Sequence, residues 1–210
     1  MLKAPNLSRF DWLVHGFGFR DSQYPPSVTT LRQIHSNIVI EACPPGGDRI
    51  AEGDALVSRE PGMIVGIRTA DCIPVLIVDS RARAVAAVHA GWRGTAGGIV
   101  ACAVDELITR YGARAEDLHA AIGPGIGPCC YEVSPDVAHQ FGAWAPHLRQ
   151  SAAPVRIDLP SINECQLRTV GVQDVWYAGE CTFCEAERYY SFRRERDQAG
   201  RMLSFAGIKK

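Results

Sequence analysis

The sequence has no long apolar run and no marked excess of charge. Both absences argue against classes of function, namely those that need a membrane span or a strongly charged surface. The longest strongly apolar stretches, such as Ile73–Val78, are far too short to cross a bilayer. With a net charge of −1, the chain offers no electrostatic reason to bind nucleic acid or an anionic membrane. The first ten residues contain no apolar core of the kind found in a signal peptide. We therefore expect a cytoplasmic protein without nucleic-acid or membrane partners.

The sequence also lacks internal repeats, low-complexity tracts and charge blocks, so nothing divides it. Its 210 residues, 47% apolar and 21% charged, are ordinary for a globular domain. We expect a single domain over residues 1–210, and this size is suited to a monomer. Eight cysteines are present, but a reducing cytosol keeps thiols free and cysteine is a common buried residue. A disulfide framework is therefore not expected.

The apolar pattern mixes strands and helices without strict βαβ alternation. The expected strands are Met63–Ile67, Ile73–Asp79, Ala84–His89, Leu118–Ile122 and Asp174–Ala178. The clearest helix has apolar residues at 3.6-residue spacing from Ile99 to Tyr111, with Thr95 as its expected N-cap and Gly112 as its stop. Shorter helices are expected at Pro135–Phe141 and Ile162–Val170. This pattern favours an α+β domain with a mixed β-sheet and packed helices.

Three side chains with metal-binding chemistry stand in short, unusual contexts. His35 lies in QIHS, Cys72 in TADCIP and His89 in HAGWRG. Two imidazoles and one thiolate suit a single borderline-soft metal ion, Zn²⁺ first and Cu²⁺ second, and three protein ligands leave the open position of a catalytic metal. If the strands after Cys72 and before His89 pair as a hairpin, these two side chains meet at one rim of the sheet. His35 must then arrive from elsewhere.

A glycine-rich turn after His89 indicates an anion site. Gly91 and Gly94 flank Trp92 and Arg93, and the turn leads into the predicted helix. Backbone N–H groups at a helix N-terminus bind anions, and Arg93 would strengthen phosphate binding. The alternative is an ordinary tight turn with a packed indole ring.

Two further groups of residues are weaker candidates. Cys181-x-x-Cys184 together with Cys129 and Cys130 would supply four thiolates, but adjacent cysteines are a poor chelate, so a second metal site is not expected. Four arginines form a basic cluster near the C-terminus: Arg193, Arg194, Arg196 and Arg201. Such clusters are usually solvated surface, and Arg194 is our candidate for the one member that enters a phosphate pocket.

These motifs resemble those of a bacterial family, the DUF152 or YfiH family, which is also described as laccase-like multicopper polyphenol oxidoreductases and as purine nucleoside phosphorylases. The resemblance runs from about residue 33 to the C-terminus, and the combination of TADC, HAGWRG and GPCCYEV is highly specific. The matching segments are Gln33–His35, Asp54–Val57, Thr69–Pro74, His89–Thr95, Gly123–Val133, Cys181–Thr182, Tyr190–Arg194 and Gly200–Arg201.

The resemblance implies an α+β fold of the cysteine-hydrolase type and a zinc site on His35, Cys72 and His89. It also implies phosphorolysis of adenosine, inosine and methylthioadenosine, with adenosine deamination as a further activity, so the expected partners are a purine nucleoside and phosphate. Arg20 is similar to the family's N-terminal, substrate-binding arginine. Only twelve residues separate Arg20 from Gln33, where the family has a longer segment. We expect this shortened lid to alter the substrate range or to leave one wall of the pocket open.

Other chemistries use the same residues. Asp71 adjoins Cys72 and is the nearest candidate for proton transfer to the leaving purine. Cys72 as nucleophile and His89 as base would instead make a hydrolase, for which cell-wall precursors are the expected substrates. One copper ion in this site would oxidise phenols as a side reaction, but six histidines without a His-x-His pair do not make a full multicopper centre. A purely structural metal would need a fourth ligand, and the sequence offers no clear one.

Overall fold

The computed structural model describes residues 1–150 and 152–210. Its larger sheet has six strands, in the order β10 (Asp174–Tyr177), β7 (Leu118–Ile122), β5 (Ile73–Asp79), β6 (Ala84–Ala90), β3 (Ala55–Ser58) and β2 (Val39–Glu41). The smaller sheet has three strands, in the order β1 (Leu13–Phe17), β11 (Met202–Ile208) and β4 (Ile64–Thr69). The larger sheet is mixed, because β10 runs parallel to β7 and β2 parallel to β3, while its inner pairs are antiparallel. The predicted α+β fold with a mixed sheet is confirmed.

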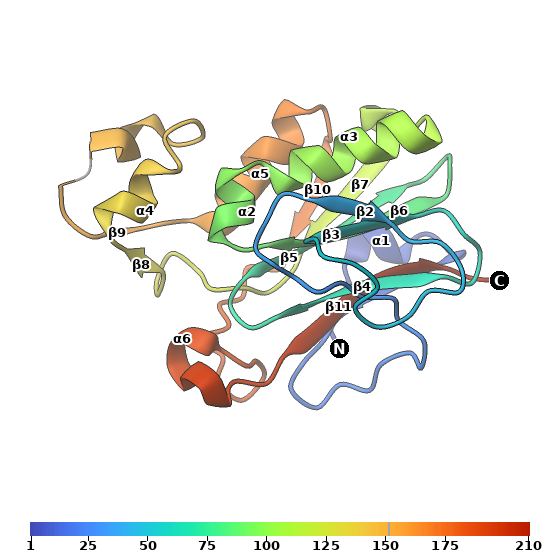
Figure 1. The fold of residues 1–210 in the computed structure, drawn as a ribbon, viewed down its shortest axis with the longest axis horizontal. Helices are drawn as coiled ribbons and strands as arrows, with labels where there is room; N and C mark the ends of the chain where they lie inside the picture. Colours follow the sequence, from blue (N-terminus) through green and yellow to red (C-terminus); the bar gives the residue numbers. More distant parts are fainter. Residues whose placement is uncertain (151) are drawn as a thin grey trace.

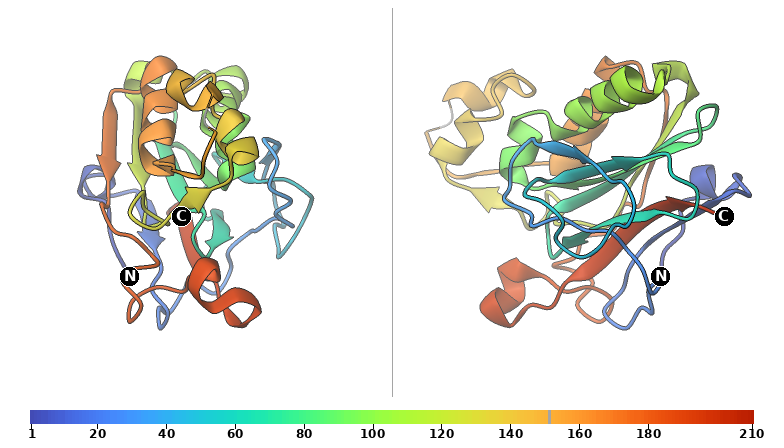
Figure 2. Two further views of the ribbon diagram at one scale, coloured as in Figure 1. Left: turned by 90° about the vertical axis from the view of Figure 1, so that its left-hand side faces the viewer. Right: turned by 45° about the vertical axis from the view of Figure 1, so that its right-hand side comes forward.

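The larger sheet is covered on both faces. Helices α3 (Ile99–Tyr111) and α5 (Leu159–Thr169) lie on one face, and the smaller sheet lies on the other (Figure 1). The turned views show α3 and α5 together on one side, with β11 on the opposite side (Figure 2). Because both faces are buried, β5 and β6 read as continuous apolar runs rather than as an alternating pattern.

Side chains of β5 alternate between two cores. Val75 and Ile77 pack toward the helices, whereas Leu76 and Val78 pack toward the smaller sheet. The β5–β6 pair is an antiparallel hairpin in which Asp79 faces Ala84 and Pro74 faces His89. This register confirms the predicted hairpin and fixes which residues meet at its open end.

The expected N-cap at Thr95 is wrong. Thr95 lies inside a separate short helix, α2 (Trp92–Ala96), and α3 begins only after Gly98. Gly98 has a φ of 75°, in the left-handed region that glycine adopts without steric cost, and this turn separates the two helices. The predicted stop is confirmed, because Gly112 ends α3 in a left-handed conformation.

The remaining short elements are mostly peripheral. They are α1 (Pro5–Ser8), α4 (Pro135–His139), α6 (Phe192–Glu195), the strand pair β8 (Glu132–Val133) and β9 (Val155–Arg156), and the 3₁₀ turns Ala115–Asp117, Pro146–Gln150 and Arg196–Gln198. The expected strands and helices are all found, with ends that shift by a few residues. The strands β1, β2, β3, β8, β9 and β11 and the short helices α1, α2 and α6 were not predicted. Within the described part of the chain, no helix combines the length and apolar character that crossing a membrane requires.

His15 of β1 is a buried titratable group within this architecture. The residue is 4% exposed, and its Nε2 accepts a hydrogen bond from the backbone N–H of Ala4 at 3.1 Å. Burial, assisted by the charge of Lys3, lowers the pKa of His15 from 6.5 to about 4. The ring is therefore neutral in the folded protein at physiological pH.

We expect His15 to make folding pH-dependent. As the pH falls below 6.5, the unfolded chain takes up a proton at His15 that the folded chain does not, so the free energy of unfolding decreases by about 2 kcal/mol between pH 7 and pH 5. Urea unfolding of the wild type and of His15→Gln at both values measures this difference. The decrease should be smaller in His15→Gln, but unchanged in the exposed-residue control His147→Gln. Equal decreases in all three proteins would contradict the assignment.

Candidate functional site

The open end of the β5–β6 hairpin brings two of the expected metal ligands together. Cys72 directly precedes β5, and His89 is the penultimate residue of β6. His35 arrives from the loop before β2, with a φ of 62°, and its ring centroid lies 5.0 Å from that of His89. Ligand atoms of the three residues all lie within 4.8 Å of one another. No further histidine, cysteine or carboxylate in the described residues joins this group. A tetrahedral ion held by these three residues would keep one coordination position open.

Asp54, at the start of β3, holds this arrangement in place. Its fully buried carboxylate accepts a hydrogen bond from Nδ1 of His89 at 2.7 Å. The same carboxylate accepts backbone N–H groups of the His35 loop, from His35 at 3.0 Å and from Ser36 at 2.6 Å, and also the Ser36 hydroxyl. Asp54 thus fixes the unusual backbone of His35 and directs Nε2 of His89 toward Cys72.

The charges of the site support one another. Burial alone would raise the pKa of Asp54, but hydrogen bonds from His89 and Ser36 lower it to about 2. Burial likewise opposes ionisation of Cys72 and His89, yet their mutual attraction lowers the pKa of Cys72 and raises that of His89. Without a metal, the site is therefore a thiolate–imidazolium pair backed by a carboxylate.

Gly91 leaves room for this site. A Cβ atom at position 91 would lie 3.1 Å from Sγ of Cys72 and 3.1 Å from Cδ2 of His35. These contacts are tighter than nearly all Cβ contacts in proteins. A side chain at position 91 would crowd Cys72 and His35, two of the three expected metal ligands. The first glycine of the HAGWRG motif avoids this crowding.

The three ligands line a cavity of about 710 Å³ with a strongly basic wall. Seven arginines contribute to it: Arg32, Arg49, Arg68, Arg93, Arg193, Arg196 and Arg201. Trp92, Tyr131 and Phe192 supply aromatic surface. Asp71 is the single acidic residue of the lining among the described residues. The excess of guanidinium groups suits an anionic ligand, and the volume is typical of small-molecule pockets.

Asp71 is the expected catalytic residue beside Cys72, and the structure places it in the cavity wall. Its carboxylate accepts hydrogen bonds from Thr182 Oγ1 at 2.7 Å, Ser191 Oγ at 3.1 Å and the backbone N–H of Arg193 at 2.6 Å. These contacts attach the segment after β10 to the cavity. In this arrangement Asp71 positions Arg193.

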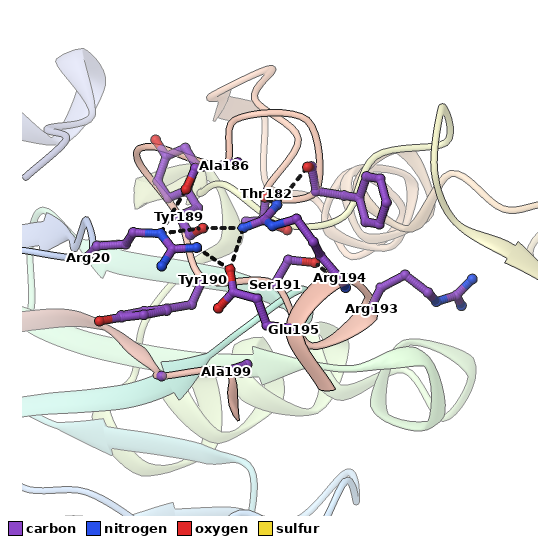
Figure 3. Close-up of polar contacts among 12 residues, drawn as sticks. Arg20, Thr182, Ala186, Tyr189, Tyr190, Ser191, Arg193, Arg194, Glu195 and Ala199 are labelled. Carbon is purple, nitrogen blue, oxygen red and sulfur yellow. Dashed lines mark hydrogen bonds and ion pairs between the residues drawn. The ribbon is translucent and has the colours of Figure 1, made fainter. Parts of the chain in front are cut away.

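Arg20 and Arg194 are not among the cavity-lining residues of the described chain. Arg194 donates to the backbone carbonyls of Thr182, Phe183 and Tyr189, at 2.6–2.8 Å. Arg20 donates to the carbonyls of Ala186 and Tyr189. Both guanidinium groups also contact the carboxylate of Glu195, as Figure 3 shows. Their donors are thus used to shape the C-terminal segment, which leaves the other arginines to face the cavity.

The sequence interpretation missed Asp54, Arg68 and Tyr131 as site residues. Asp54 had a recognisable signal, since a carboxylate directly before a buried strand needs several partners. Arg68 is a charged residue in the otherwise apolar strand β4, where it pairs with Asp48 at 2.8 Å on the cavity rim. Tyr131 follows two cysteines in a loop, and nothing in its local sequence indicates the cavity.

Comparison with known proteins places this arrangement in a family. The model described as "Multi-copper polyphenol oxidoreductase laccase" matches residues 17–209. The chain belongs to this family. Within the family, the crystal structure of YlmD from Geobacillus stearothermophilus superposes with a TM-score of 0.87 at 27% identity, covering 99% of this chain and 94% of that one.

Two curated proteins that resemble this chain carry enzyme names. A protein of Deinococcus radiodurans named purine nucleoside phosphorylase is 42% identical over 183 residues, which cover 85% of this chain and 69% of that protein. A protein of an unknown prokaryotic organism named adenosine deaminase RL5 is 37% identical over 163 residues, covering 74% of this chain and 61% of that protein. The relatives' names describe chemistry on purine nucleosides, whereas the family description refers to phenol oxidation.

We expect Asp54→Asn to weaken metal binding while the protein remains folded. The amide keeps the shape of the carboxylate, but it removes the charge and the acceptor capacity that orient His35 and His89. Loss of such a supporting group lowers metal affinity about 10- to 100-fold. Competition with a colorimetric chelator measures the Zn²⁺ dissociation constant, and exposed Asp105→Asn is the matched control. An unchanged constant in Asp54→Asn would remove Asp54 from the site.

Proposed function

We propose that this protein is a zinc-dependent purine nucleoside phosphorylase that acts on adenosine, inosine and methylthioadenosine and also deaminates adenosine. We further propose that it works as a cytoplasmic monomer. The observation that carries the proposal is the placement of three soft donor atoms within 4.8 Å of one another in an arginine-lined cavity. The names of the relatives support the same chemistry.

The donor set fits Zn²⁺. Sγ of Cys72 and one ring nitrogen from each of His35 and His89 are the ligand types that zinc prefers, and the hydrogen bond from Nδ1 of His89 to Asp54 leaves Nε2 of His89 as the ligating nitrogen. Bound there, the ion would supply Lewis-acid activation of water or of a substrate oxygen. Cu²⁺ is a second ion that these ligands accept, and with copper the site would support phenol oxidation only as a side reaction.

The basic wall is the proposed phosphate site. Arg93 is exposed, and its guanidinium lies over the Trp92 ring, with 4.2 Å from Cζ to the ring centroid, beside the proposed metal ligands. Arg193 reaches the same cavity from the C-terminal segment, held by its backbone N–H on Asp71. Guanidinium groups bind phosphate oxygens through paired hydrogen bonds, so these residues would hold phosphate next to the ribose. Arg20 and Arg194 stay proposed substrate-binding residues, and their contacts with backbone carbonyls and Glu195 add a positioning role for the segment that carries Arg193.

The aromatic lining would hold the purine. Trp92 and Phe192 offer flat apolar surfaces on which a base can stack. Burial and the nearby charge of Cys72 raise the pKa of Tyr131 to about 12, so its hydroxyl is a hydrogen-bond donor at neutral pH. In phosphorolysis a phosphate oxygen bonds to C1′ as the C1′–N9 bond breaks, and the electron pair leaves on the purine. The leaving purine then takes up one proton. We propose that the Tyr131 hydroxyl donates a hydrogen bond to the leaving base, and that Asp71 contributes through Arg193, which its carboxylate positions.

A second candidate function is favoured by the chain of contacts from Cys72 through His89 to Asp54. A thiol, an imidazole and an orienting carboxylate in this order form the arrangement of a cysteine hydrolase. Such an enzyme would use Cys72 as the nucleophile, with cell-wall precursors as the expected substrates. Metal content separates the two functions, because a thiolate that binds zinc is unavailable for attack.

Product analysis tests the proposed function directly. Purified protein of known metal content is incubated with adenosine in the presence and absence of phosphate. We expect adenine and ribose 1-phosphate only when phosphate is present. Deamination should release ammonia in both conditions, with inosine as the product without phosphate and its phosphorolysis product hypoxanthine in addition when phosphate is present. Cys72→Ala should lose the metal of this site and both activities while the fold is retained. Protein that holds no metal on Cys72 and turns over none of adenosine, inosine and methylthioadenosine would move the assignment to the hydrolase.

Replacing Arg93 should weaken phosphate binding specifically. We expect Arg93→Ala to raise the KM for phosphate about tenfold or more, because charge-assisted hydrogen bonds to phosphate are lost, while the KM for inosine changes little. Steady-state kinetics with each substrate varied in turn measures both constants. Arg81→Ala, which removes an exposed arginine paired with Asp117, is the control. Equal changes in both constants for Arg93→Ala would remove Arg93 from the phosphate site.

A further inference from the structure

The fold brings together four cysteines that lie far apart in the sequence and outside the cavity. Cys129 and Cys130 are in the loop after β7, and Cys181 and Cys184 are in the loop after β10. All four sulfur atoms lie within 4.8 Å of one another. Sγ of Cys184 is 3.7 Å from that of Cys129 and 3.4 Å from that of Cys130. Adjacent cysteines were expected to be a poor chelate. Here Cys129 and Cys130 both point to Cys184, so their adjacency does not prevent them from sharing one site.

We propose that Cys129, Cys130, Cys181 and Cys184 form a second zinc site with four thiolate ligands. A tetrahedral ion with Zn–S bonds of about 2.3 Å places its sulfurs about 3.8 Å apart. The separations of 3.4 and 3.7 Å are close to this value. A disulfide links only two sulfurs at about 2.05 Å and gives no reason for a third and a fourth to converge. Closed coordination by four protein ligands indicates a structural ion.

The backbone is arranged around the cluster. Thr182 N–H donates to Gly125 O at 2.9 Å, and a parallel bridge joins Gly125 to Cys181, so the two cysteine loops run side by side. The N–H of Gly127 donates to Sγ of Cys181 at 3.2 Å. A Cβ atom at Gly127 would lie 3.3 Å from Sγ of Cys129, so a side chain there would crowd the sulfurs.

The proposed ion would tie down one wall of the cavity. Tyr131 directly follows the first cysteine pair, and Asp71 accepts the Thr182 hydroxyl between Cys181 and Cys184. Arg194 donates to the carbonyls of Thr182 and Phe183 within the same turn (Figure 3). Zinc here would therefore fix the loop that presents Tyr131 and the segment that presents Arg193, without touching the substrate. This role is independent of the reaction catalysed in the cavity.

Zinc counting tests the proposal. Full-length protein is purified under reducing conditions without chelator, and zinc per chain is measured by mass spectrometry of the metal. The double variant Cys129→Ser/Cys184→Ser should contain one zinc ion fewer than the wild type. The control Cys43→Ser/Cys165→Ser changes two other exposed cysteines and should lose none. Equal zinc in the wild type and the first variant, or iron in place of zinc, would overturn the proposal.

A second measurement does not depend on that variant folding. In Cys72→Ser the thiolate of the cavity is absent, so cobalt–thiolate absorption after loading with Co²⁺ must come from another cysteine site. We expect the strong visible bands of tetrahedral cobalt with sulfur ligands. Absence of these bands, or an intact mass two hydrogens lower that reveals a disulfide, contradicts the site. If the cavity binds no zinc, the wild type will contain one zinc ion fewer than the two expected. The difference between the wild type and the double variant will still be one ion, so failure of the proposed function leaves this test intact.

Discussion

The buried carboxylate of Asp54 is the constraint on which the cavity depends. A fully buried charge is tolerated only when its oxygens are satisfied, and here the donors are the ring of His89 and the backbone of the His35 loop. One side chain thus connects the core of the larger sheet to a loop with little apolar anchoring. The requirement to solvate this carboxylate explains why His35 adopts a left-handed backbone that few residues other than glycine occupy.

Sequence reasoning succeeded where burial or strand pairing determined the structure. The apolar runs at Ile73–Asp79 and Ala84–Ala90 are strands because both faces of the larger sheet are covered, and their antiparallel register brings Cys72 to His89. The left-handed glycine at 112 ends α3 for a purely local reason. Thr95 failed as an N-cap because Gly97 and Gly98 break the helix, and the left-handed turn at Gly98 outweighs the capping preference of a hydroxyl.

Long-range polar contacts could not be predicted from the sequence. Arg20 and Arg194 stand in motifs that resemble those of an enzyme family, but a motif does not say whether a guanidinium faces a ligand or a backbone carbonyl. In the fold, Arg194 satisfies carbonyls of a tight turn and Glu195, and these short contacts determine its direction. The convergence of the four cysteines was not predicted, for a related reason. Linear spacing describes a chelate only when its ligands come from one segment, and here two distant turns supply two thiols each.

The segment from residue 181 to residue 201 is attached to the body by directional contacts more than by apolar burial. Tyr189 is its one fully buried large side chain, and Thr182 and Ser191 are buried polar groups bound to Asp71. Hydrogen bonds to a carboxylate contribute about 1.5–3 kcal/mol each to stability, so the few that Asp71 accepts account for much of the attachment of this wall. A zinc ion on the cysteine cluster would anchor the start of the segment and, because Thr182 and Arg193 share Asp71 as acceptor, would also support the part that carries Arg193. His35, Cys72 and His89 do not depend on this segment, because Asp54 and the hairpin hold them in place.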